Sequence, residues 1–356
     1  MDLDYTFPKI RLDLCCCNLT LKYKNNVFSS RRKNLATILQ KGLEDSEVAA
    51  KENLVDLLKM LLWAKNHGID VMRISSELVP HGSNTTIIEE FGEKGEKYLS
   101  LQFAKPYLEI IGKIVKLEGI RTTFHPGQFV QIASPSISIF ENSVREIRMH
   151  VLFLDLMKVD LNSVIVIHIG GTYLNKESTT RTFIERFKTI DPILQRRIVL
   201  ENDEKSYDAQ DVLEICKEVG RPMVFDIHHY NTYKYYNPDA TQKSIDEMMP
   251  DILDTWTKLN IRPKFHLSEQ MDGKPMGTHS LYIKEIPLKF LEIPSKYGVE
   301  IDIMIEAKGK EIAISKLYKK YPQLVPKFRK KLPSTIHPDA LKDLKLSTKV
   351  KEKLKK

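Results

Sequence analysis

The chain has 356 residues, of which 42% are hydrophobic and 8% aromatic, as expected of a globular protein with a core. No apolar run approaches the roughly 18 to 20 residues of a membrane span, and the N-terminal segment MDLDYTFPKIRLDL lacks the apolar stretch of an export signal. Three of the four cysteines are adjacent, which argues against a disulfide framework or a zinc finger. Reduced thiols predict an intracellular protein, cytoplasmic or nuclear.

The net charge of +8 is unevenly distributed along the chain. Residues 316–356 contain 14 Lys/Arg and 3 Asp/Glu, a net +11, so the remainder carries −3. We therefore predict a catalytic domain over 1–315 and a basic C-terminal extension over 316–356. Such an extension would suit a polyanion such as nucleic acid, or would be a solvated terminus.

Eight apolar runs predict β-strands, and helical patterns separate them. The strands are expected at 10–14, 70–74, 120–124, 163–168, 197–201, 222–227, 262–267 and 300–306, and the main helices at 46–66, 96–117, 139–160, 181–189, 209–219, 242–259 and 285–298. Eight strand–helix units predict an α/β fold, the (β/α)8 TIM barrel. A doubly wound open sheet is the alternative, but it would gather its ligands at one switch point rather than at six or more strand ends.

Side chains that bind metals lie at or just beyond the ends of these runs. In a parallel barrel all strand ends meet on one face, and this many buried imidazoles and carboxylates would need cations to neutralise them. The sequence therefore predicts a site with several metal ions. The nine candidate ligands are His81, His125, His168, Glu201, Asp226, His229, His266, His279 and Glu306.

Glu201, the pair Asp226 and His229, and the nearby Lys264 have specific expectations. Glu201, in LEND, is expected to bridge two cations with its two oxygens. In FDIHHY, Asp226 and His229 could share an ion once the chain turns, although strand alternation alone favours His228. Lys264 shares a strand face with His266, so a charged lysine would be repelled by cations, and we expect it to be neutral or modified.

The ligand set indicates which metals are expected. All nine residues offer imidazole nitrogen or carboxylate oxygen, which suits Mn²⁺ or Zn²⁺ and tolerates Fe²⁺. This much imidazole argues against Mg²⁺ or Ca²⁺. Two to three divalent ions are expected.

As a set, the segments RISSELVPH, FHPGQFV, VIHIGG, LENDE, VFDIHHY, KFHLSEQ and MIEAKGKE resemble the UV damage endonucleases, relatives of the endonuclease-IV class. The resemblance covers about residues 10 to 315 and implies a TIM barrel with up to three metals, usually manganese, that nicks DNA beside a UV photoproduct. It implies that the nine residues above are ligands, with His229 favoured over His228. It also implies that Lys264 can be carboxylated and act in catalysis.

The resemblance also implies how damage is sensed. Gln128 and Phe129 match a Gln-Tyr pair that wedges into the duplex at the lesion, and Asn18 and Arg73 are further expected DNA contacts. Two positions depart from the family: Phe129 lacks the tyrosine hydroxyl, and Leu14 stands where a second tyrosine is expected and cannot stack on a base.

The leading hypothesis is a monomeric, metal-dependent endonuclease that binds damaged double-stranded DNA and hydrolyses the phosphodiester immediately 5′ to the photoproduct. An AP endonuclease acting mainly at abasic sites is the first alternative. A metal-dependent sugar isomerase is a more remote one, because those barrels use more carboxylates and fewer histidines.

Overall fold

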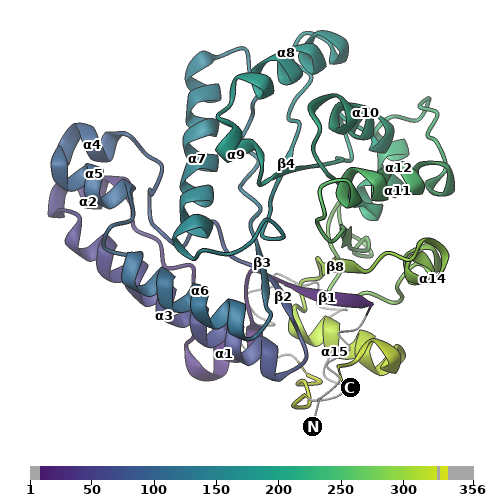
Figure 1. Ribbon diagram of the computed structural model, residues 1–356, viewed down its shortest axis with the longest axis horizontal. Coiled ribbons are helices and arrows are strands. Elements are labelled where there is room, and N and C mark those ends of the chain that lie inside the picture. Colours follow the sequence, from purple (N-terminus) through teal and green to yellow (C-terminus); the bar gives the residue numbers. More distant parts are fainter. Residues whose placement is uncertain (1–8, 327–328, 336–356) are drawn as a thin grey trace.

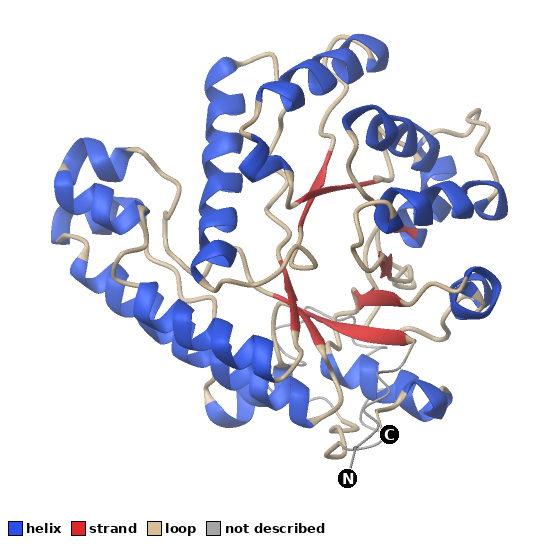
Figure 2. Cartoon of the chain, in the orientation of Figure 1, coloured by secondary structure: helices blue, strands red, loops and turns tan. Residues whose placement is uncertain are grey.

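The computed structural model describes residues 9–326 and 329–335, and in these residues a ring of parallel strands is surrounded by helices (Figure 1; Figure 2). The eight expected strands are all present. They are β1 (Ile10–Cys15), β2 (Val71–Arg73), β3 (Arg121–Thr123), β4 (Ile165–His168), β5 (Ile198–Glu201), β6 (Met223–Asp226), β7 (Lys264–Leu267) and β8 (Ile301–Ile305).

Hydrogen bonding joins the strands into a closed ring. The sheet has the order β3-β2-β1-β8-β7-β6-β5-β4, and every pair is parallel. The two ends of this order meet at Phe124, which forms a parallel bridge with Ile165. Phe124 donates its backbone N–H to Val164 at 3.0 Å and accepts from Val166 at 2.9 Å. The predicted (β/α)8 TIM barrel is therefore confirmed.

The helices form the outer layer (Figure 2). They are α1 (Leu19–Asn25), α2 (Leu35–Lys41), α3 (Glu44–Asn66), α4 (Thr86–Phe91), α5 (Glu93–Leu99), α6 (Lys105–Leu117), α7 (Ile137–Leu156), α8 (Lys176–Thr189), α9 (Pro192–Gln195), α10 (Ala209–Val219), α11 (Ile227–Tyr236), α12 (Ile245–Thr257), α13 (Leu288–Leu291), α14 (Ile293–Tyr297) and α15 (Glu311–Lys320), with a 3₁₀ turn at Pro322–Leu324. Within the described ranges, no helix is both long and apolar enough to cross a membrane.

Two expected helices are each divided into two. The pattern over 96–117 contains α5 and α6, which are separated where Leu101 adopts a φ of 54°, a conformation that no α-helix allows. The pattern over 285–298 contains α13 and α14; Pro294, in the first turn of α14, lacks the N–H that a continuous helix would need. Periodicity alone did not detect either interruption.

The interior of the barrel contains ion pairs as well as the branched apolar side chains that usually fill such barrels. At the N-terminal end of the strands, the fully buried Asp302 accepts from Arg11 at 2.7 and 2.8 Å and from Arg121 at 2.6 Å. Arg262 lies 3.0 Å from the same carboxylate. Two residues further along β1, Asp13 contacts Lys264 of β7, and both side chains are fully buried.

The packed core continues past residue 315, where the basic extension was expected to begin. Helix α15 crosses this position, and Leu317 and Tyr318 are buried in the main core. Leu324 and Leu332 join the same core. The remainder of the expected extension, residues 336–356, lies outside the described residues.

The Asp302 carboxylate should be a major determinant of stability, because three guanidinium groups depend on it. Replacing Asp302 with Asn should lower the free energy of unfolding at pH 7 by about 3–5 kcal/mol, measured by urea denaturation. Asp254→Asn, which removes an exposed ion pair with Lys258, should cost below about 1 kcal/mol. If Asp302→Asn lowers the free energy of unfolding by no more than this control does, Asp302 is not a major determinant of stability.

The pH dependence of this effect follows from the pKa of Asp302, which the adjacent Arg11 and Arg121 hold well below its usual range even though burial would raise it. Its stabilising contribution is therefore complete above about pH 4 and is lost as the pH falls through the lower pKa of the folded state. The difference between wild type and Asp302→Asn should shrink below about pH 4.

Candidate metal centre

Glu201, the last residue of β5, is at the centre of a cluster of histidines on the C-terminal face of the barrel. Its carboxylate is almost fully buried, at 1% exposure. One oxygen, Oε2, lies 2.8 Å from Nε2 of His125 and 3.5 Å from Nε2 of His168. The other, Oε1, lies 2.6 Å from Nδ1 of His266 and 4.0 Å from Nδ1 of His229. Each oxygen thus faces its own pair of imidazoles.

Three groups of side chains in the described part of the chain could each hold an ion, with ligand atoms within 4.8 Å of one another. They share members, so the groups adjoin. The groups are His125, His168 and Glu201; Glu201, Asp226 and His229; and Asp226, His266 and Glu306. Seven of the nine expected ligands are therefore brought together.

The turn after β6 brings His229, rather than His228, into one of these groups. Asp226 ends the strand and caps α11, with Oδ1 accepting from the backbone N–H groups of His228 at 2.7 Å and His229 at 2.9 Å. Because the chain enters a helix here, a residue three positions later can turn back to the strand end. The His229 ring is fixed by a 2.8 Å hydrogen bond between Nδ1 and the carbonyl of Asn202. His228 packs instead beside the ring of His279.

The electrostatics of the cluster reflect buried carboxylates that are compensated by imidazoles. Burial alone would raise the pKa of Glu201, but the nearby His266, His168 and His125 hold it well below its usual range. Burial opposes protonation of His229, but Asp226, Glu201 and Glu204 raise the pKa of its ring to about 10. The carboxylates therefore favour positive charge beside them.

Side-chain atoms with no hydrogen-bond partner test whether this donor set fits a divalent cation. Among the described residues, Oδ2 of Asp226 and Nε2 of His266 are buried and make no hydrogen bond. Leaving such atoms unpaired costs about 1–3 kcal/mol each. Both are ordinary ligand atoms, and the set of imidazole nitrogens and carboxylate oxygens suits Mn²⁺, Zn²⁺ or Fe²⁺. The residues present fit divalent metals.

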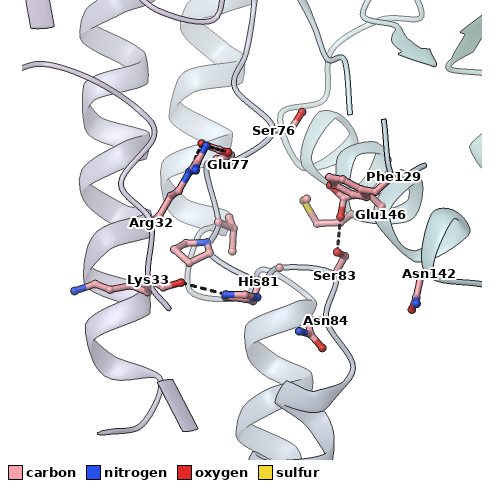
Figure 3. A pocket seen from close by; sticks show the side chains of 14 residues that line it. Arg32, Lys33, Ser76, Glu77, His81, Ser83, Asn84, Phe129, Asn142 and Glu146 are labelled. Atoms are coloured by element: carbon pink, nitrogen blue, oxygen red, sulfur yellow. Dashed lines mark hydrogen bonds and ion pairs between the residues drawn. The ribbon is translucent and has the colours of Figure 1, made fainter. Parts of the chain in front are cut away.

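The two remaining expected ligands lie at the edge of the cluster or outside it. His279 reaches it through Glu306, with Nδ1 3.7 Å from Oε2. His81 is outside all three groups: its φ is 53°, and its Nε2 lies 3.1 Å from the carbonyl oxygen of Lys33 (Figure 3). The structure thus does not bring His81 together with the others.

Gln128 and Phe129, the expected probe pair, are exposed in the loop that follows β3. Phe129 is 63% exposed and lines a pocket of about 510 Å³ together with His81 and Glu146 (Figure 3). A Cβ at Gly127 would lie 2.5 Å from the Phe129 ring, so only glycine allows the ring to lie against the loop in this way. The ring is available for contact without being part of the core.

The other expected site residues are buried and paired. Arg73 donates to Oε1 of Glu306 at 2.6 Å and to Sγ of Cys15 at 2.6 Å. Asn18 caps α1 by accepting from the N–H of Leu21 at 2.8 Å.

Lys264 and Leu14 are both fully buried in the barrel. Lys264 contacts Asp13, an anionic partner that the sequence analysis did not identify, although Asp13 is the one acidic residue in the first apolar run. Burial lowers the pKa of Lys264, whereas Asp13 raises it.

Asn202 is a site residue that sequence reasoning missed. It is fully buried, accepts from the backbone N–H of Asp226 at 2.9 Å and donates to the Asp226 carbonyl at 3.0 Å. Its own backbone carbonyl is hydrogen-bonded to Nδ1 of the His229 ring. Asn202 therefore fixes the end of β6, and with it two candidate ligands. Only its position next to Glu201 in LEND could have suggested this role.

Comparison with known proteins places these features in context. A family model described as UV-endonuclease UvdE matches residues 10–334. A putative UV-damage endonuclease of Acanthamoeba polyphaga mimivirus is 34% identical over 88% of this chain and 91% of its own length. The UV-damage endonuclease of Schizosaccharomyces pombe is 35% identical over 90% of this chain but only 52% of its own length. The crystal structure of SacUVDE superposes with a TM-score of 0.74 at 28% identity, covering 88% of this chain and 99% of that one.

The role of Asn202 can be tested by replacing it with Ala. The change leaves the buried N–H and carbonyl of Asp226 unpaired, so the free energy of unfolding should fall by about 2–4 kcal/mol. Asn66→Ala, an exposed residue at the end of α3, should change it by less than about 0.5 kcal/mol. Equal stability of the two variants in a urea titration would show that Asn202 does not fix the strand end.

Proposed function

The chain belongs to the UV-endonuclease UvdE family, and on that premise we propose that it is a metal-dependent DNA-repair endonuclease. Its substrate would be double-stranded DNA inside the cell, which it would cut as a monomer, hydrolysing the phosphodiester immediately 5′ to a UV photoproduct. The observation that carries the proposal is the clustering of four imidazoles around the two oxygens of the buried Glu201.

Two to three divalent ions, with Mn²⁺ favoured and Zn²⁺ as the alternative, would be held at the three adjoining groups, and Glu201 and Asp226 each belong to two of these. Because the two oxygens of Glu201 face separate pairs of imidazoles, Glu201 is the proposed bridging ligand. His279 would assist through Glu306, and His81 would serve only if its loop rearranged. When bound, such ions activate water and neutralise the charge that develops on the phosphate oxygens.

The chain's own residues would position the substrate and the ligands. The carbonyl of Asn202 holds the His229 ring in place, and Asp226 accepts from the His229 backbone N–H. Arg73 donates to one oxygen of Glu306. Gln128 and Phe129 are exposed where a duplex would approach the strand-end face. The flat Phe129 ring could stack on a base while the Gln128 amide hydrogen-bonds to the base that pairs with it. Phe129 would stack without the hydroxyl that the family tyrosine provides.

The decisive test of the proposed activity uses a duplex that carries one defined photoproduct, with Mn²⁺, Zn²⁺ and EDTA compared. We expect one nick immediately 5′ to the photoproduct with Mn²⁺, and none with EDTA. A matched duplex with one abasic site separates the alternative activity: faster cutting at the abasic site would identify an AP endonuclease instead.

Glu201→Gln should nearly abolish incision while DNA binding persists. The change keeps the volume of the side chain but removes the bridging charge, and loss of a catalytic ligand typically costs several kcal/mol of transition-state stabilisation. Incision rate, metal content and duplex affinity would be measured together, with Glu214→Gln on the exposed face of α10 as the control. Retention of more than about a tenth of the wild-type rate would argue against bridging.

Phe129→Ala should reduce incision of a damaged duplex roughly tenfold, since stacking is worth about 1–3 kcal/mol per base. Because the ring is 63% exposed, metal content and thermal stability should stay near wild type. Leu117→Ala, which changes an exposed apolar residue at the end of α6, provides the control. Normal incision by Phe129→Ala protein would remove the ring from damage recognition.

A further inference from the structure

A second pocket adjoins the metal centre at the ends of β7 and β8. It has a volume of about 460 Å³ and includes His279 and Glu306, two expected ligands, in its wall. Thr278, from the loop after β7, and Lys308 and Lys310, from the loop after β8, line the remainder together with Arg73 and Cys15. In barrels of this class, the loops after the seventh and eighth strands often form a phosphate-binding site.

The cations in this pocket are not all compensated. Arg73 is paired with Glu306 and Cys15, each at 2.6 Å. In the described part of the chain, the ammonium groups of Lys308 and Lys310 make no hydrogen bond or ion pair. Partial burial and the cation of Lys274 lower the pKa of Lys308. Burial would lower the pKa of Lys310, but the thiols of Cys15, Cys17 and Cys16 raise it. Lys310 is therefore held in its charged form without being tied into an ion pair among the described residues.

The loop that carries the two lysines is held firmly in place. Lys308 and Gly309 donate their backbone N–H groups to the carbonyls of Ser280 at 3.0 Å and Leu281 at 2.8 Å. A Cβ at Gly309 would lie 2.5 Å from the Leu281 carbonyl, so the two loops are in close contact. Lys310 then adopts a φ of 48°, in the left-handed region, immediately before α15. The backbone that carries the lysines is thus preorganised.

We propose that this pocket binds a phosphodiester of the substrate strand, distinct from the one that is cleaved, through Lys308 and Lys310. The inference rests on the proposed function, because it needs a nucleic-acid strand at the adjacent metal centre. A strand held at the centre would pass its neighbouring phosphates over the pocket wall that Glu306 and His279 share with the centre. Two lysines there that make no ion pair within the described part of the protein would fix the register of the strand without reading its sequence.

The first arm of the test measures binding of an undamaged duplex to the full-length protein at several salt concentrations. The variant is Lys308→Met with Lys310→Met, and the control is Lys116→Met, an exposed lysine on α6. Loss of one phosphate contact should lower the salt slope by about 0.9 and affinity by about tenfold at moderate salt. An affinity and slope equal to those of the control would overturn the proposal.

The second arm places one neutral methylphosphonate at each position of the damaged strand in turn. One position, not the cleaved bond, should raise the KM of wild type by about tenfold with little change in kcat, and should have no further effect in the double variant. If the methylphosphonate changes KM equally in wild type and the double variant at every position, the proposed phosphate subsite is wrong. If neither wild type nor the double variant incises DNA, the proposed function is wrong. The binding measurement still shows whether the pocket holds a phosphate of the duplex.

Discussion

A carboxylate buried at the end of β5 imposes the main constraint on this molecule. Glu201 is 1% exposed and faces four imidazoles, and neighbouring Asp226 and Glu306 add two more carboxylates. A protein interior tolerates such a concentration of ionisable groups only when charges are compensated at short range. A proton on His229, whose ring pKa the carboxylates raise, can supply part of that compensation, and divalent cations would supply it more completely.

The arrangement that delivers these groups follows from strand geometry. Alternate residues of a strand face the same side. Arg11, Asp13 and Cys15 therefore share one face of β1, and Lys264 and His266 share one face of β7. The barrel interior is therefore layered, with the ion pairs of Asp302 and of Lys264 beneath the ligand cluster. We infer that these pairs help to keep the strand ends in register, since each joins strands that are far apart in the sequence.

The fold could be predicted from the sequence because eight strand–helix units leave few alternatives. Six of the eight strand ends could be located because the apolar run closes on or just before a candidate ligand. These six ligands, with His229, are the seven that lie in shared groups. His81 lies outside these groups because it follows the strand in a loop where its φ is positive, a conformation that periodicity does not describe. The roles of Asp13 and Asn202 could not be predicted, because each depends on a partner brought close by folding: Lys264 for Asp13, and the Asp226 backbone for Asn202.

Metal analysis of the purified, active protein tests the central claim most directly. If Glu201 and its neighbours form a multinuclear centre, elemental analysis should find at least two equivalents of divalent metal per chain in wild type. Glu201→Gln protein prepared in parallel should contain clearly less metal. Fewer than one equivalent in wild-type protein that retains full activity would contradict the account.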